Sequence, residues 1–65
     1  MPTHPGSNFV VHGTKPTGES IDYGPFDSFN DAQDAANYGM STGVIVNWYM
    51  TWTDPHGNTV NYENS

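Results

Sequence analysis

The sequence predicts an α+β fold with the order β-β-α-β-β, in which two hairpins form one antiparallel four-stranded sheet and a single helix packs on one face. Three observations predict it. Two turn signals of the form X-Pro-X-Gly lie about forty residues apart. Apolar and polar residues alternate over residues 44–53, which is the period of a half-buried strand. Between the two turn signals, apolar residues recur at helical spacing.

The first hairpin is predicted around the turn KPTG, residues 15–18. Proline presets the backbone for the second turn position and glycine accepts the left-handed conformation that closes the loop. The flanking residues 9–11 are aromatic and β-branched, as strands favour. A three-residue loop of this kind sets the register. It pairs four sets of residues: Lys15 with Glu19, Thr14 with Ser20, His12 with Asp22, and Val11 with Tyr23.

A helix is expected from about residue 28 to residue 38. Ser28 is a good N-cap, and Asp31 stands where a capping box places an acidic residue. The apolar side has helical spacing and small side chains that allow close packing; its members are Phe29, Ala32, Ala35, Ala36 and Met40. Either Gly39 or Gly43 ends the helix. Strand order in the sheet stays open.

The second hairpin is predicted around the turn DPHG, residues 54–57. The same turn geometry pairs Asp54 with Asn58, Trp52 with Val60, and Met50 with Tyr62. Alternation assigns the even positions to the core, namely Val44, Val46, Trp48, Met50 and Trp52. The other sheet face would then carry Val10, His12, Asp22, Ile45, Asn47, Tyr49, Thr51, Asn61 and Glu63.

The length of 65 residues allows one domain at most. We expect a flexible arm over residues 1–7 and a single domain over residues 8–65. The chain has no cysteine, so disulfides and thiolate metal sites are excluded. The core must come from large side chains, and the aromatic residues, 14% of the chain, meet that need.

The charge balance limits the classes of partner. Lys15 is the only basic side chain against seven acidic ones, and the formal net charge is −6. One cation cannot neutralise a run of phosphates, so direct nucleic-acid binding and an anionic membrane surface are not expected. A basic protein partner is favoured. Without an apolar span or a signal-peptide pattern, the cytoplasm is the expected location, the host cytoplasm if the chain is viral.

The strongest candidate site is an acidic helix side. Asp27, Asp31, Asp34 and Tyr38 follow one another at spacings of four, three and four, which places them on one side of a helix. Glu19 and Asp22 of the first hairpin are expected nearby. This set is typical of a recognition surface with one aromatic anchor. The alternative is a solvated helix face whose acids interact favourably with the helix dipole.

Three other groups of residues are weaker candidates for a functional site. His12 opposite Asp22 would form an acid–base pair or a plain cross-strand contact, and the latter is favoured. The three histidines match no metal motif, and no glycine-rich phosphate loop opens the helix, so we expect no cofactor, no metal and no enzymatic activity. Tyr49 among amides and hydroxyls would alternatively hold a sugar or a peptide.

The sequence therefore predicts a small acidic interaction protein that binds a basic partner surface and is not an enzyme. Its composition is typical of inhibitors and accessory proteins of viruses and mobile elements. The alternative is a structural subunit that forms a homo-oligomer through its edge strand or through the sheet face carrying Val10, Ile45, Asn47, Tyr49 and Thr51. A less favoured alternative is a domain that binds a small ligand or a carbohydrate.

Overall fold

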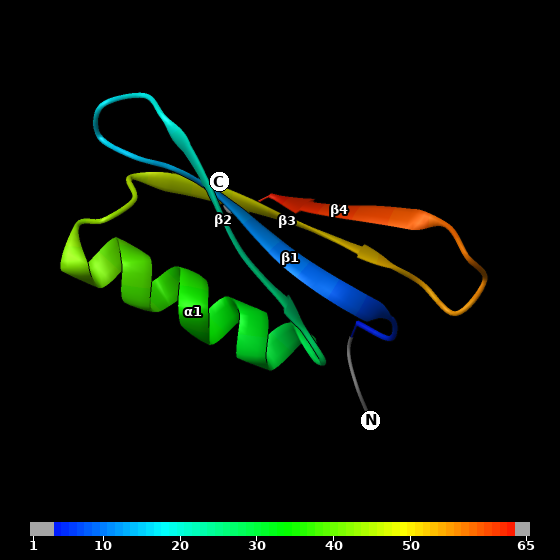
Figure 1. The fold of residues 1–65 in the computed structure, drawn as a ribbon. Helices are drawn as coiled ribbons and strands as arrows, with labels where there is room; N and C mark the ends of the chain where they lie inside the picture. Colours follow the sequence, from blue (N-terminus) through cyan, green and yellow to red (C-terminus); the bar gives the residue numbers. More distant parts are fainter. Residues whose placement is uncertain (1–3, 64–65) are drawn as a thin grey trace.

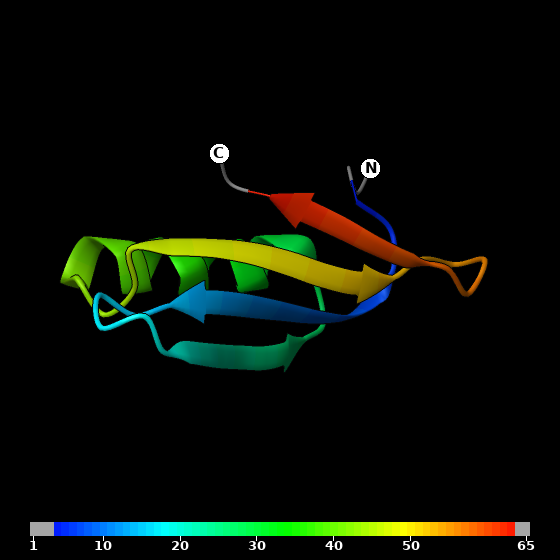
Figure 2. The same ribbon diagram turned by 90° about the horizontal axis from the view of Figure 1, so that it is seen from above.

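The computed structural model describes residues 4–63, and it confirms the predicted α+β fold (Figure 1). The elements, in chain order, are β1 (Ser7–Thr14), β2 (Ser20–Phe26), α1 (Phe29–Thr42), β3 (Asn47–Thr53) and β4 (Thr59–Glu63). The four strands form one antiparallel sheet in the order β2-β1-β3-β4, which Figure 2 shows face-on.

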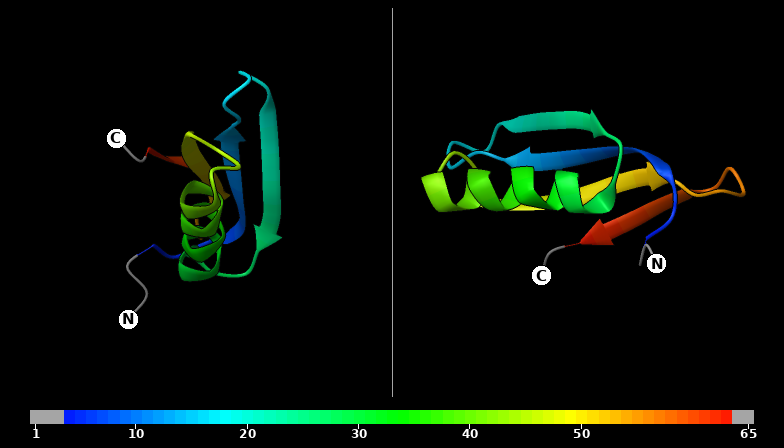
Figure 3. Two further views of the ribbon diagram at one scale, coloured as in Figure 1. Left: turned by 90° about the vertical axis from the view of Figure 1, so that its left-hand side faces the viewer. Right: turned by 90° about the horizontal axis from the view of Figure 1, so that it is seen from below.

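The helix connects β2 and β3, the two strands that flank β1 in the sheet. Because β2 and β3 both pair antiparallel with β1, they run in the same direction, and the chain needs a long crossover between them. That crossover is α1, which packs on β1, β2 and β3 (Figure 3) and reaches β4 only through the contact of the Phe29 ring with that of Tyr62. One face of the sheet is therefore covered along three strands, and the other face carries no helix.

Both hairpins have the predicted register. In the first, Val11 pairs with Tyr23 and His12 with Asp22; in the second, Met50 pairs with Tyr62. The two loops close in the same way. The amide of Lys15 donates to the carbonyl of Glu19 at 2.7 Å, and the amide of Asp54 donates to the carbonyl of Asn58 at 2.8 Å. Two Pro–Gly loops of one type thus fix both registers.

The core lies between α1 and the covered sheet face. Its members are Phe9, Val11, Phe29, Ala32, Ala36, Ile45, Trp48, Met50 and Trp52. The helix contributes mostly small residues to this layer, and the strands contribute the large ones. A short chain has little core volume, and here two tryptophans and two phenylalanines pack in the core beside the small residues of the helix.

The helix is longer than predicted. Ser28 caps it as expected, accepting a hydrogen bond from the amide of Asp31 at 3.2 Å. The predicted end at residue 38 is wrong, because Gly39 stays helical and buried, whereas the alternative end at Gly43 is confirmed, with φ 79° at that residue. The amide of Gly43 donates to the carbonyl of Met40, and that of Val44 donates to the carbonyl of Gly39 at 3.0 Å. These two bonds form a Schellman motif.

The predicted alternation fails at the start of β3. Ile45, expected on the outer sheet face, is 1% exposed, whereas Val44 and Val46, expected in the core, are 43% and 55% exposed. The strand begins only at Asn47, so residues 44–46 belong to the turn after the helix and do not follow strand geometry. Ile45 instead enters the space beside Gly13 and Gly39, neither of which has a side chain there.

The described part of the N-terminal arm touches the core. Of residues 1–7, the first three lie outside the described residues, and Ser7 begins β1. The ring of His4 lies 4.1 Å from that of Phe29 and 5.6 Å from that of Tyr62. His4 thus covers an aromatic cluster at one end of the core.

Candidate functional site

The outer side of α1 carries the predicted acidic set. Asp31 and Asp34 are exposed, and Tyr38 is 72% exposed, the largest value among the exposed large hydrophobic residues. Asp27 is also exposed but precedes the N-cap, so it lies beside the first turn of the helix and not on it. Three of the four predicted residues therefore share one helix side, and Asp27 lies just before the helix start.

The carboxylates of this helix side have no charged partner within residues 4–63. The ion pair found there joins His12 to Asp22, on the other side of the sheet. The last turn of α1 contains no basic residue. Acidic charge near the N-terminus of a helix is stabilising, so the dipole accounts for Asp31. It does not account for Asp34 or for the exposed ring of Tyr38, which lie farther along the helix.

The C-terminal half of α1 and the turn after it expose several apolar side chains. Four of the five exposed large hydrophobic residues belong to the second half of α1 and the turn that follows: Tyr38, Met40, Val44 and Val46. We call them the apolar end. The sequence assigned Met40, Val44 and Val46 to the core. Only the Schellman turn, which moves residues 44–46 out of strand alternation, exposes the two valines.

The structure separates the remaining two acidic residues from the helix set. Glu19 lies beside the hairpin turn, where its carboxylate accepts a bond from the Thr17 hydroxyl at 3.4 Å. Because β2 leads into the start of α1, this hairpin lies at the opposite end of the helix from Asp27 (Figure 1). Asp22 faces away from the helix altogether, since the neighbouring Tyr23 packs against the core.

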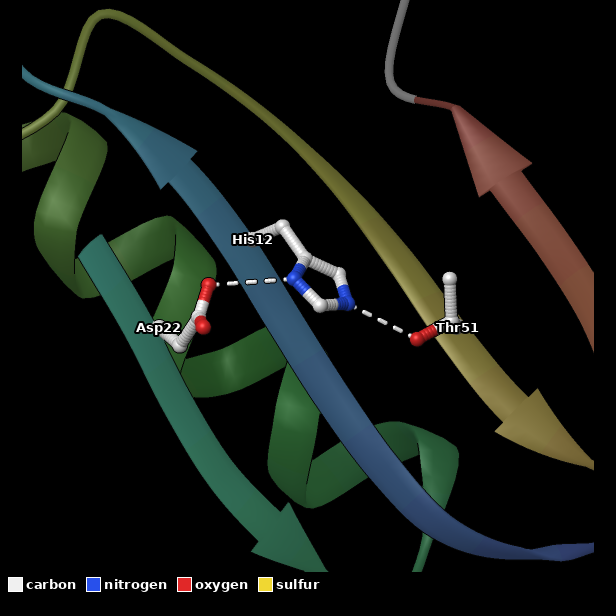
Figure 4. Close-up of polar contacts among 3 residues, drawn as sticks. All are labelled: His12, Asp22 and Thr51. Carbon is white, nitrogen blue, oxygen red and sulfur yellow. Dashed lines mark hydrogen bonds and ion pairs between the residues drawn. The ribbon is translucent and has the colours of Figure 1, made fainter. Parts of the chain in front are cut away.

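Asp22 belongs instead to a polar network on the open sheet face (Figure 4). Nδ1 of His12 lies 3.0 Å from Oδ1 of Asp22, and Nε2 lies 2.8 Å from Oγ1 of Thr51. The three side chains come from β2, β1 and β3. The sequence pairs His12 with Asp22, but Thr51 is 39 residues from His12 and joins only because β3 lies next to β1.

The order carboxylate, imidazole, hydroxyl is that of a catalytic triad, in which the imidazole removes the proton of the hydroxyl. Such a site also needs hydrogen-bond donors aimed at a developing oxyanion. Thr51 lies on a strand that is paired on both sides, so sheet bonding occupies the backbone N–H groups around it. Because these N–H groups are already hydrogen-bonded within the sheet, the network is better explained as a structural contact between neighbouring strands.

Tyr49 completes the open face. Its ring stacks on that of His12 with centroids 4.7 Å apart, and it is 47% exposed. Val10 and Thr51 are half-buried on the same face and Asn47 is exposed, whereas Ile45 is not part of it. The stacking on His12 covers one face of the Tyr49 ring.

The three histidines lie on different parts of the fold, at the arm, on β1 and in the second turn. Within residues 4–63 no group of three histidine, cysteine or acidic side chains is placed to hold a metal ion. In the same part of the chain, no helix is long and apolar enough to cross a membrane.

Comparison with known proteins finds no family model, no curated protein and no solved structure that matches this chain.

Proposed function

We propose that this protein is a small non-enzymatic interaction module that binds a basic protein surface through the outer side of α1. The observation that carries the proposal is the position of Tyr38: a 72% exposed aromatic side chain on the helix side of Asp31 and Asp34. Tyrosine is frequent among the residues that dominate binding energy at interfaces.

The charge of the chain supports the same function. The chain has seven acidic side chains and one Lys or Arg, and the carboxylates of α1 have no ion-pair partner within residues 4–63. A basic partner would therefore be attracted over a distance and oriented by Asp31 and Asp34. Val44 and Val46 of the apolar end lie just beyond the C-terminus of the same helix and would add exposed apolar contact area. In this arrangement charge sets approach and register, and the aromatic ring supplies affinity.

A pull-down from the native host tests this function. The wild-type chain is compared with Asp31→Lys/Asp34→Lys and with Tyr38→Ala. We expect a basic protein that elutes as salt is raised and is lost with both variants. The control is Thr17→Lys/Asn58→Lys, which adds two cations at the exposed hairpin turns and keeps the partner. Unchanged recovery and salt dependence with the α1 variants would overturn the proposal.

A further inference from the structure

The two edges of the sheet differ in their capacity to pair with another strand. The edge strand β2 contains Gly24 and Pro25, and its register with β1 shifts opposite them. Proline has no N–H group to donate, so this edge is interrupted. The other edge strand, β4, pairs regularly with β3 over all five residues and contains no proline or lysine. Edges without such protection are templates for strand addition.

The hairpin determines which backbone N–H and C=O groups of β4 point toward β3 and which point to the free edge. In an antiparallel pair, hydrogen-bonded and non-bonded residue pairs alternate. The bonded pair Asp54–Asn58 closes the loop, so Val60 and Tyr62 direct their N–H and C=O groups toward β3. The backbone groups of Thr59, Asn61 and Glu63 therefore point to the free edge.

We propose that β4 pairs antiparallel with β4 of a second copy of this chain and so joins two sheets into one of eight strands. The twofold axis passes between Asn61 and Asn61 of the second copy. With Asn61 opposite its own copy, Thr59 lies opposite Glu63 of the second copy. Each of the three outward residues then belongs to a hydrogen-bonded pair. Because each such pair in an antiparallel ladder exchanges two bonds, six backbone hydrogen bonds join the two strands. The strand is self-complementary in this register.

The side chains fit the same register. On the helix side, Val60 lies opposite Tyr62 of the second copy, twice over, and an aromatic residue opposite a β-branched one is a favourable cross-strand pair. Both are only partly buried against the core, where the Tyr62 ring lies 5.1 Å from that of Phe29 in α1. On the open face, Asn61 meets Asn61, and their amides can bond to each other. No carboxylate meets another at the joined edge.

Charge sets the conditions for this pairing. Each chain carries −6, so two copies repel. The two Glu63 residues lie four residues apart along the joined strands, about 13 Å, which is beyond the Debye length of roughly 8 Å at physiological salt. Because added salt screens the repulsion between the two net negative charges, dimerisation should strengthen as salt is raised. Binding of a basic partner should weaken under the same change, so the two proposals respond in opposite directions.

Sedimentation equilibrium tests the interface, from about 5 to 200 µM protein, concentrations that span the micromolar affinity expected of a small interface. We expect a concentration-dependent dimer for the wild type. Asn61→Asp places two carboxylates at the axis and should weaken the dimer at least tenfold. Asn47→Asp makes the same chemical change at an exposed site away from β4 and should leave it unaltered. Monomer mass for the wild type at all concentrations and salt levels would overturn the proposal.

Disulfide trapping tests the register, since the chain has no cysteine of its own. Bonded antiparallel pairs have Cα atoms about 5.5 Å apart, within the range that a disulfide spans. Asn61→Cys should therefore crosslink under mild oxidation much faster than Asn47→Cys. Equal rates would reject a twofold axis at Asn61. Far-ultraviolet circular dichroism confirms that each variant is folded before either measurement.

Discussion

Ile45 fills the space that Gly13 leaves on the covered face of the sheet: a Cβ atom added to Gly13 would lie 2.7 Å from Cγ2 of Ile45. Gly39 leaves space for the same side chain from the helix, with a built Cβ 3.0 Å from Cγ1 of Ile45. One isoleucine thus joins the end of β1 to the last turns of α1. This contact explains why α1 continues through Gly39 and why Ile45 departs from the outer face.

The first prediction concerns Ile45 and its neighbour. Ile45→Ala should lower the free energy of unfolding by about 2–4 kcal/mol, because it removes buried methyl groups and leaves a cavity. Val46→Ala, at a site 55% exposed, should change it by less than about 0.5 kcal/mol. Urea denaturation measures both. Simple alternation along residues 44–53 requires the opposite ranking, so that result would contradict the structure.

The second prediction concerns Gly13. Gly13→Ala should destabilise the fold by about 1–3 kcal/mol, because the added methyl group overlaps Ile45. The cost should fall in the Ile45→Ala background, where the overlap is gone. A double-mutant cycle of unfolding free energies measures this coupling. Additive effects of the two substitutions would show that the side chains do not share the space.

The third prediction concerns the tautomer of His12. When His12 is neutral, the proton should reside on Nδ1, because the Asp22 carboxylate only accepts and the Thr51 hydroxyl can donate to Nε2. Long-range ¹H–¹⁵N correlation spectra at alkaline pH distinguish the two tautomers. His56, which is exposed, provides an internal reference for the ordinary mixture. A proton on Nε2 would mean that the network does not persist in solution.

The fourth prediction concerns the second turn. The side chain of Asp54 accepts hydrogen bonds from the amides of His56 at 2.9 Å and Asn58 at 2.8 Å. Asp54→Ala should therefore cost about 1 kcal/mol of unfolding free energy. Asp54→Asn retains an acceptor and should cost less. His56→Ala, at the exposed turn tip, should stay within about 0.5 kcal/mol and leave partner binding intact.

The hairpins could be predicted closely because their information is local. Each Pro–Gly turn constrains its loop, and a fixed loop length sets which residues face each other. The pairs His12–Asp22 and Trp52–Val60 follow from this without knowledge of the rest of the chain. The N-cap is local in the same sense, since the hydroxyl of Ser28 reaches the amide of Asp31 three residues away.

The errors lie where local signals compete. Gly39 and Gly43 are both suitable helix ends, and the sequence does not say that Gly39 must remain helical to make room for Ile45. Alternation over residues 44–53 looks continuous, but its first three residues belong to the turn after α1. Val44 and Val46 make up half of the apolar end, so local patterns in the sequence could not predict this part of the candidate surface.

The sequence by itself determined the element order, both hairpin registers, the helix cap and the acidic side of α1, since each depends on residues within a few positions of one another. Only the tertiary structure decided the strand order β2-β1-β3-β4, the hydrogen bond between His12 and Thr51, and the separation of Asp22 from the acidic residues of the helix. It also decided which edge stays open. The physical reason is that strand neighbours across β1 are chosen by how the helix and the large side chains share a small core, and that packing has no local signal in the chain.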